Sequence, residues 1–476
     1  MENLKDKTIN GVTWSFIESA SLKVIQFVLN VVLARLLLPD HYGVIAIIMV
    51  FITISQIFID GGFATALIQD KNKTERDYST VFTFNIAISV VCYLILFVSA
   101  PLISKFYNND ITLYLRVESL GLIIYSFAAI PRVRLTVKVD FKSIAKVTLT
   151  SALCSGCIGV ILAYNGFGVW SLIGQYLSAS VITTVLYIVL QRWKPVCFFD
   201  VQSFKRLFPF GIRLLASRLV DRIYANMYPI IVGKFYTTKE LGFYSRADQF
   251  ASLPSNTCAD MFLRVTYPIM SSLDNDSDFI KIYKKFISLS SFVIFPIMFL
   301  LVVIAKPLIL ILLTEKWSGT IILLQILCFG HMYAHILMIS RNVLYAKGRA
   351  DLALRLEIIK KSVATAFLLI SVPFGLIGLC VGKVSYDISA VFISSIYTKK
   401  ITGVSLWSQI TDFAPAWIIG FVSAIIAYLP IVFFDNNWVQ LLAGSALYIL
   451  VYVGISYFFK IASFKEVIDL IKERIR

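Results

Sequence analysis

Charged residues are scarce in this 476-residue chain. They make up 15% of it, whereas hydrophobic residues make up 58% and the mean hydropathy is +0.81. A soluble domain carries about 25% charged residues. A chain of this length with so few charged residues could not keep its apolar surface away from water. The scarcity excludes a soluble globular protein and favours a polytopic membrane protein.

Cysteine and histidine are scarce too. The seven cysteines lie in or beside apolar segments, and Cys154-x-x-Cys157 falls in an apolar stretch where packing is a better interpretation than redox or metal chemistry. His331 and His335 stand at i, i+4 but have no evident third ligand, so we expect no metal site. No Ser-His-Asp or Cys-His arrangement is apparent, and we expect neither catalytic residues nor enzyme activity.

The net charge of +16 does not by itself indicate a nucleic-acid-binding protein. Such proteins cluster their basic residues on one soluble face, whereas here these residues lie mostly between apolar runs. No intervening loop exceeds about 20 residues, and a soluble domain typically needs about 50 or more. We therefore expect no nucleic-acid partner.

Apolar segments recur along the whole chain. A helix needs about 20 apolar residues to cross the hydrocarbon core, so the sequence predicts an all-α membrane protein with about 14 transmembrane helices. The predicted spans are residues 11–38, 42–69, 80–104, 111–131, 144–164, 167–190, 207–233, 240–271, 282–304, 317–346, 352–374, 376–398, 412–434 and 438–459. Residues 464–476 alternate charged and aliphatic residues at helical spacing, which predicts a helix on the membrane surface.

Lysine and arginine are distributed unevenly over the predicted loops. If the N-terminus is cytoplasmic, the inner loops and the two tails hold 27 of them and the outer side holds 6. The outer six are Arg35, Lys105, Lys234, Lys239, Lys306 and Lys316. Because cytoplasmic loops of membrane proteins are enriched in basic residues, we expect both termini in the cytoplasm.

Eleven basic and eight acidic residues remain within the predicted spans. Each would cost about 2.5–3.5 kcal/mol at the bilayer centre if it faced lipid. They must therefore pair with one another or line a wet cavity. The sets that we interpret as structural pairs on one helix face are Lys383 with Asp387, Asp260 with Arg264, and Glu357 with Lys360 and Lys361.

The first predicted span has a polar stripe. Ser19, Lys23, Gln26 and Asn30 follow the spacing i, i+4, i+7, i+11, which places them on one face of an otherwise apolar helix. At 1.5 Å per residue, Lys23 lies about 18 Å into that helix, too deep for its ammonium group to reach the membrane surface comfortably. This face is expected to meet a wet cavity.

The seventh predicted span has a comparable face. Arg218 and Arg222 stand at i, i+4, with Asp221 beside them. A shift of 199 residues places Ser19 on Arg218 and Lys23 on Arg222. The same shift also superposes Arg35 on Lys234 and Gly43 on Gly242. This weak repeat favours two half-molecules around a shared cationic cavity; the alternative is two separate buried ion pairs.

A series of motifs over about residues 5–400 carries a family resemblance. They are LARLLLPDHYGVIAI (33–47), FIDGGFATALIQDKNKTERDYSTVFTFN (58–85), APLISKFY (100–107), VDFKSIAK (139–146), GFGVWSLIGQ (166–175), RLFPFGIRLLAS (206–217), IIVGKFYTTKELGFYSRADQFASLP (230–254), YPIMS (267–271), LLTEKW (312–317) and LYAKGR (344–349). In these motifs the chain resembles Wzx-type polysaccharide flippases. It is most similar to the WzxC-like lipopolysaccharide or exopolysaccharide exporters of the MOP (MATE-like) superfamily.

The resemblance implies an architecture. Family members have two six-helix bundles arranged as a V around a cavity, followed by two C-terminal helices. The implied parts of this chain are an N-terminal six-helix bundle (1–200), a C-terminal six-helix bundle (201–400), transmembrane helices 13 and 14 (401–460) and a cytoplasmic amphipathic tail (461–476).

The resemblance also implies a function. Family members move a polyprenyl-diphosphate-linked oligosaccharide from the inner to the outer leaflet of the bacterial cytoplasmic (inner) membrane. They do so by alternating access, for the biosynthesis of O-antigen, capsule or exopolysaccharide. The implied partners are this lipid-linked oligosaccharide, membrane lipids, and the polymerase and chain-length machinery of the same pathway. No cofactor is expected beyond a coupling ion, either a proton or sodium.

Two other functions stay open. A MATE-type exporter of small molecules or drugs has the same fold, but its usually cationic substrates would be repelled by a basic cavity. A membrane-embedded polysaccharide polymerase or glycosyltransferase usually presents a large outer loop or an acidic catalytic pair, and neither is evident here.

These considerations define a predicted site. Arginine binds phosphate oxygens bidentately and lysine acts as a point charge, whereas carboxylates can orient these cations or bind the coupling ion. The predicted substrate-binding residues are Lys23, Asn30, Arg35, Arg218, Arg222 and Arg246. The predicted charge partners or ion-coupling residues are Glu18, Asp60, Asp221 and Asp248. The resemblance supports the four that match family motif positions, Arg35, Asp60, Arg246 and Asp248, whereas Arg218 and Arg222 rest on the physical argument.

Overall fold

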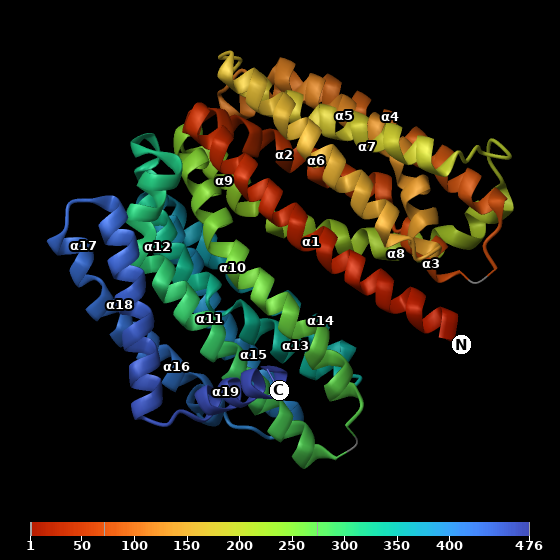
Figure 1. Cartoon of the computed structure of the whole chain (residues 1–476). Helices are drawn as coiled ribbons and strands as arrows, with labels where there is room; N and C mark the ends of the chain where they lie inside the picture. The colour runs from red at the N-terminus through yellow and green to blue at the C-terminus, as the bar shows by residue number, and fades with distance from the viewer. Residues whose placement is uncertain (1, 71, 274, 476) are drawn as a thin grey trace. The chain divides into compact units, whose positions relative to one another are not determined.

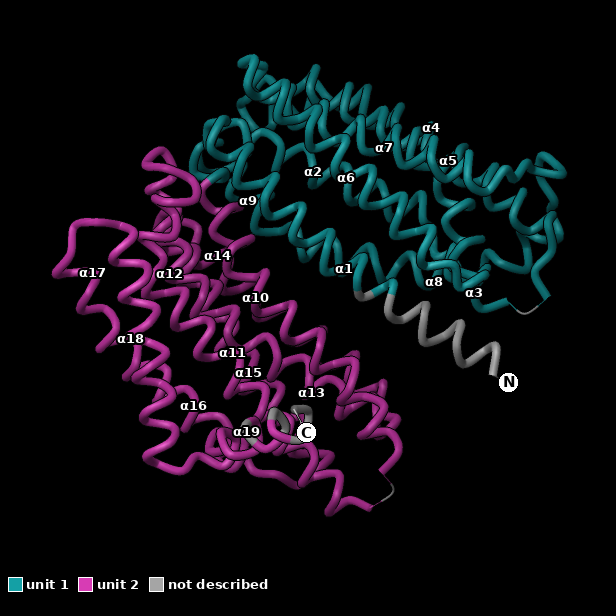
Figure 2. Tube along the Cα trace, viewed as in Figure 1, with its two compact units in different colours: residues 1–242 teal, residues 243–476 magenta. Residues whose placement is uncertain are grey.

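The computed structural model describes residues 2–70, 72–273 and 275–475, which are helical apart from turns and short connections. The chain forms two compact units, Met1–Gly242 and Phe243–Arg476, shown in teal and magenta in Figure 2. The predicted bundles, 1–200 and 201–400, are defined by counting six helices each, whereas the two units are defined by compactness. The predicted division therefore stays a prediction.

The first unit contains α1 to α9 and the first residues of α10 (Figure 1). The bounds are α1 (Glu2–Leu36), α2 (Pro39–Asp60), α3 (Phe63–Gln69), α4 (Glu75–Tyr107), α5 (Thr112–Val137), α6 (Phe141–Tyr164), α7 (Val169–Gln191), α8 (Val201–Ala225) and α9 (Met227–Phe235). Helices α4, α5, α7, α6 and α1 pack in that spatial order, and α2 and α3 pack against α8. A buried cluster that includes Phe63, Tyr78, Ile130 and Leu207 joins α3, α4, α5 and α8.

The second unit is built around α11 and α15. Its bounds are α10 (Thr238–Ser271), α11 (Asp276–Leu313), η1 (Glu315–Trp317), α12 (Gly319–His331), α13 (Ala334–Ala346), α14 (Ala350–Ser371), η2 (Val372–Phe374), α15 (Gly375–Thr402), α16 (Leu406–Ala427), α17 (Leu429–Phe433), α18 (Asn437–Phe458) and α19 (Ala462–Ile475). Helix α11 packs against α12, α16 and α18, and α15 packs against α12, α13 and α14.

The membrane class predicted from the sequence is confirmed. Among the described residues, 11 helical segments are long and apolar enough to cross a membrane. Helices α8 and α10, which carry several charges each, are not among them, and α14 with α15 forms one segment, Ala350–Thr402. Every predicted span overlaps a helix, but the number 14 stays a prediction.

Four predicted spans are interrupted. Span 412–434 breaks at Tyr428, and each of the other three breaks at or within one turn of a charged or titratable residue. Span 42–69 breaks after Asp60, where Gly61 and Gly62 have φ angles of 48° and 73° that glycine adopts readily. Span 207–233 breaks one turn after Arg222. Span 317–346 breaks directly after His331. Hydrophobicity does not reveal such breaks, because the apolar run continues through them.

The C-terminal tail is helical, as its periodicity predicts. Lys285 Nζ lies 3.3 Å from Glu466 Oε2, and the hydroxyls of Ser288 and Ser463 lie 2.6 Å apart. These contacts fasten the beginning of α19 to α11. Arg476, the last residue of the predicted tail, lies outside the described residues.

Candidate functional site

A cavity of about 460 Å³ lies within the first unit, at the carboxyl end of α2 beside α8. Its lining residues are Ile57, Asp60, Arg218, Asp221, Arg222 and Ala225. Four of the predicted site residues are therefore brought together from two helices far apart in the sequence. Their predicted roles in binding and charge pairing remain predictions.

Glycine permits the close approach of α8 to the break between α2 and α3. A Cβ on Gly62 would lie 2.6 Å from the carbonyl oxygen of Gly211, and a Cβ on Gly211 would lie 3.0 Å from that of Gly61. Side chains would force these two segments apart. The contact brings the arginines of α8 to the cavity beside Asp60.

Hydrogen bonds from neighbouring helices orient the cavity side chains. Arg218 Nη2 donates to Thr65 Oγ1 on α3 over 3.2 Å. The Tyr125 hydroxyl on α5 donates to Asp60 Oδ1 over 3.4 Å, and Arg132 and Arg218 both attract the Asp60 carboxylate. Arg218 and Arg222 are nevertheless exposed, so their guanidinium groups are accessible to a ligand.

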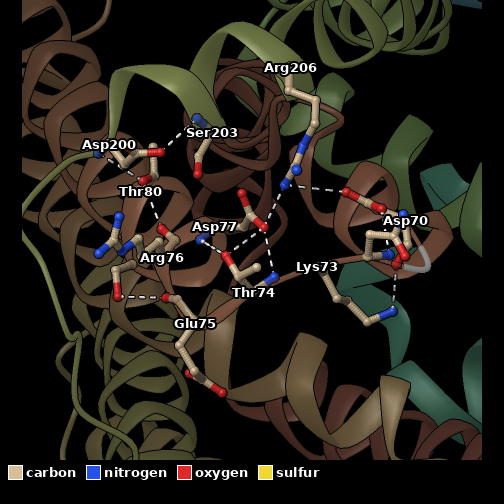
Figure 3. A network of polar contacts seen from close by, with 12 residues as sticks. Asp70, Lys73, Thr74, Glu75, Arg76, Asp77, Thr80, Asp200, Ser203 and Arg206 are labelled. Carbon is tan, nitrogen blue, oxygen red and sulfur yellow. Dashed lines mark hydrogen bonds and ion pairs between the residues drawn. The ribbon is translucent and has the colours of Figure 1, made fainter.

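A polar network fixes the first turns of α8 (Figure 3). Arg206 Nη2 lies 2.6 Å from Asp77 Oδ2 and 3.5 Å from Asp70 Oδ2. Asp77, whose side chain is fully buried, also accepts from the Thr74 amide over 2.7 Å and from the Thr74 hydroxyl over 2.9 Å. The network holds the start of the helix whose later turns carry Arg218 and Arg222.

Asp200 caps the same helix. Its Oδ2 accepts from the Ser203 amide over 2.8 Å, and its own amide donates to Thr80 Oγ1 on α4 over 3.0 Å. The hydrogen bonds from the Ser203 hydroxyl and amide hold the pKa of Asp200 below its ordinary value. Asp200 is therefore ionised at neutral pH, where its charge complements the positive end of the helix dipole.

The predicted residues of α1 do not line the 460 Å³ cavity. Glu18 accepts a hydrogen bond of 3.0 Å from the Thr148 hydroxyl on α6. Lys23 and Arg35 are exposed along α1, and Asn30 is half-buried. Their roles stay predictions.

In the second unit, Arg246 is buried and lies over an aromatic ring. Its guanidinium carbon is 6.0 Å from the Trp317 ring centroid, and Nη1 donates to Gln249 on the same helix. The arginine is thus held by aromatic and amide groups of its own unit. A substrate contact for Arg246 also stays a prediction.

Asp248 belongs to a cluster that sequence analysis did not foresee. Its Oδ1 lies 2.9 Å from His331 Nε2 and 3.9 Å from Lys383 Nζ. Lys383 Nζ is 3.5 Å from Asp387 Oδ2, which confirms the predicted local pair but places it within a four-residue cluster. His335, which the sequence offered as a neighbour of His331, contacts Ser291 Oγ over 2.9 Å instead.

The other two local pairs have different outcomes. Lys360 Nζ lies 2.8 Å from Glu357 Oε1, which confirms that pair. No ion pair joins Asp260 and Arg264 among the contacts of the described residues, so that interpretation is wrong. Spacing of i, i+4 permits a contact but does not require one.

Comparison with known proteins identifies the family. Residues 32–322 match a family model described as polysaccharide biosynthesis protein. This match covers more than half of the chain. The chain belongs to this family. It is a multi-pass membrane protein that acts in polysaccharide-biosynthesis transport, and it is a transporter rather than an enzyme.

Individual relatives agree. The family member is 28% identical over 360 residues to the teichuronic acid biosynthesis protein TuaB of Bacillus subtilis (74% of each chain). It is 23% identical over 439 residues to the lipopolysaccharide biosynthesis protein WzxC of Escherichia coli (89% of each chain). Its fold is similar to that of the lipid II flippase MurJ in an inward closed conformation, with a TM-score of 0.78, 17% identity, and coverage of 96% of this chain and 100% of that one. The fold is thus MurJ-like and MATE-like.

Proposed function

We propose that this transporter moves a polyprenyl-diphosphate-linked oligosaccharide from the inner to the outer leaflet of the bacterial cytoplasmic membrane. The glycan would enter surface polysaccharide such as O-antigen, capsule or exopolysaccharide. The observation that carries the proposal is the pair of accessible arginines, Arg218 and Arg222, in a cavity of a polysaccharide-transport family member.

The cavity suits a diphosphate because two exposed guanidiniums line it. Two guanidiniums and two carboxylates line it, so its lining charges balance. A diphosphate can take the place of Asp60 and Asp221 at the guanidiniums, since each arginine offers paired N–H donors that match phosphate oxygens. Such contacts would strengthen once a bound lipid excludes water from the cavity. A volume of about 460 Å³ falls within the range typical of small-ligand sites.

The transport cycle that we propose is alternating access, with both termini in the cytoplasm. The lipid-linked glycan would bind from the inner leaflet through its diphosphate. After its release, the Asp60 and Asp221 carboxylates would again compensate the charges of the arginines. Without that compensation, the empty cavity would leave guanidiniums unpaired at membrane depth, which is costly.

Reconstitution tests the proposal. Vesicles containing the purified full chain receive a fluorescent polyprenyl-diphosphate-linked disaccharide, and the probe that reaches the opposite leaflet is measured by chemical quenching. We expect movement of this probe and none of a neutral, phosphate-free glycolipid with the same tail. Equal movement of both lipids, or transport of a cationic dye in preference to either, would contradict the assignment. The second result would favour a MATE-type exporter.

A further inference from the structure

One imidazole nitrogen in the second unit has two competing partners. His331 Nε2 lies 2.9 Å from Asp248 Oδ1 on α10 and 3.3 Å from Lys383 Nζ on α15. A protonated nitrogen can donate to the carboxylate but cannot accept from the ammonium. An unprotonated nitrogen can accept from the ammonium but cannot donate to the carboxylate. The proton on this nitrogen therefore decides whether the His331 side chain bonds to α10 or to α15.

The charges of the cluster leave room for one proton. Asp248 and Asp387 contribute two negative charges and Lys383 contributes one positive charge. With neutral His331 the cluster carries one net negative charge, and with protonated His331 it is neutral. Charge inside a helical bundle is costly unless it is compensated. The Lys383 ammonium already stands between the carboxylates, where it would repel a sodium ion.

The position of His331 links this proton to the backbone. His331 is the last residue of α12, directly before the break that separates α12 from α13. The negative end of the α12 dipole favours a cation there. The Ser255 hydroxyl on α10 donates to the His331 carbonyl. At Gly330, a Cβ would lie 2.5 Å from Asp387 Oδ2, so the glycine lets this carboxylate approach α12.

Other titratable groups near the cluster are few. Cys380 interacts electrostatically with Lys383 and Asp248, and Tyr386 interacts with Asp387 and with Glu357 on α14. Helix α11 also packs against α12, but in the described residues no hydrogen bond or ion pair joins its titratable groups to His331. The switch therefore rests on Asp248, His331, Lys383 and Asp387.

We infer that His331 is the binding site for a coupling proton. Binding moves the Nε2 contact from Lys383 on α15 to Asp248 on α10, at the break between α12 and α13. In the proton-free state the neutral imidazole carries its one proton on Nδ1, and Nε2 accepts from Lys383 on α15. In the proton-bound state Nε2 is protonated and donates to Asp248 on α10. Since the inference names the ion that drives the proposed flippase, it rests on the proposed function.

The transport experiment compares rates with and without an imposed pH gradient in the vesicles described above. The wild-type rate should be higher with the pH gradient than without it, and a sodium gradient at equal pH should have no effect. At equilibrium, exchange of one proton per lipid would change the ratio of the lipid between the leaflets about tenfold per unit of pH difference. In His331→Gln the ratio of the two rates should fall to about one. His335→Gln, which changes a neighbouring histidine outside the cluster, should keep the wild-type ratio. Drive by sodium, or an intact pH response in His331→Gln, would overturn the inference.

A second measurement needs no substrate and separates the two proposals. The chain has three histidines, so a histidine-labelled full-length protein in nanodiscs gives few NMR signals, and the His331 signal is the one lost in His331→Gln. Asp248→Asn should change the His331 signals at low pH and Lys383→Gln those at high pH, because each variant removes the Nε2 partner assigned to one of the two states. Signals unchanged by both variants would refute the proton site. If the signals change as expected but the wild type flips no diphosphate lipid, the proposed substrate is wrong and the proton site stands.

Discussion

Gly43 and Gly242 make the same contact with exchanged partners. A Cβ on Gly43 would collide with the carbonyl of Thr238, the first residue of α10, and a Cβ on Gly242 would collide with the carbonyl of Pro39, the first residue of α2. Both pairs are related by the 199-residue shift found in the sequence, and the Thr238 hydroxyl also donates to Asp40 Oδ1 over 3.1 Å. The reciprocal contact supports an internal repeat, with the first turns of α2 and α10 as equivalent elements.

The glycine contact predicts matched effects of alanine at the two positions. Gly43→Ala and Gly242→Ala should each lower the stability by about 1–3 kcal/mol, because the colliding atoms belong to the backbone and cannot rotate away. The two variants should behave alike, since each glycine faces the equivalent carbonyl. Melting temperature and abundance in membranes measure the effect. Gly454→Ala is the control, as a Cβ there meets nothing within 4 Å. A normal melting temperature in either variant would show that the helices separate at little cost.

The cavity predicts a transport defect without a folding defect. Arg222→Gln should remove a charge-assisted contact worth about 1.5–3 kcal/mol, which corresponds to a roughly ten- to hundredfold slower flipping rate. Because Arg222 is exposed, the abundance of the Arg222→Gln protein in the membrane should stay normal. Arg222→Lys should restore the rate only in part, because an ammonium lacks the paired donors. Arg213→Gln, on the same helix but outside the lining residues, serves as control.

A purely structural role of Arg222 makes a different prediction. If Arg222 only compensates Asp221, each single variant should lower abundance by stranding a charge. The double variant Asp221→Leu/Arg222→Leu would then recover both abundance and flipping. Recovery of flipping in the double variant would therefore refute the binding role.

The contact between Arg206 and Asp77 predicts a stability defect. Arg206→Gln should leave the fully buried Asp77 carboxylate with hydrogen bonds from Thr74 and Ser203 but without its cationic partner. The expected cost is about 1–3 kcal/mol of stability, read as lower abundance and melting temperature. Adding Asp77→Asn should recover part of the loss, because the buried charge is gone. Lys205→Gln, an exposed neighbour, should have no effect. If the Arg206→Gln protein melts normally, the network does not anchor α8.

The uneven distribution of basic residues predicts the topology. In a variant whose seven cysteines are replaced, a single cysteine at Asn109 should react with a membrane-impermeant maleimide from outside the cell membrane. A cysteine at Asn72 should react only after permeabilisation, because the loop that contains it is expected in the cytoplasm. Labelling of Asn72→Cys in sealed spheroplasts would invert the topology.

Hydrophobic run length and helical spacing were enough to predict the membrane class, the positions of the helices and the Lys383–Asp387 pair. Each depends on interactions within one segment, such as backbone hydrogen bonds between residues i and i+4 or a side-chain contact one turn away. The sequence motifs also predicted the family to which the chain belongs. Arg218 and Arg222 could be singled out because charge is conspicuous in an apolar helix.

Only the tertiary structure decided which charges meet. His331 and Asp248 are 83 residues apart, and nothing in either local pattern specifies the other, because their contact depends on how α10, α12 and α15 pack. The break after His331 also escaped prediction, since an apolar run continues through it while the backbone leaves the helix. Helix formation is governed by neighbours along the chain, whereas the partner of a buried charge is set by packing between distant segments, which must compensate that charge where water is excluded.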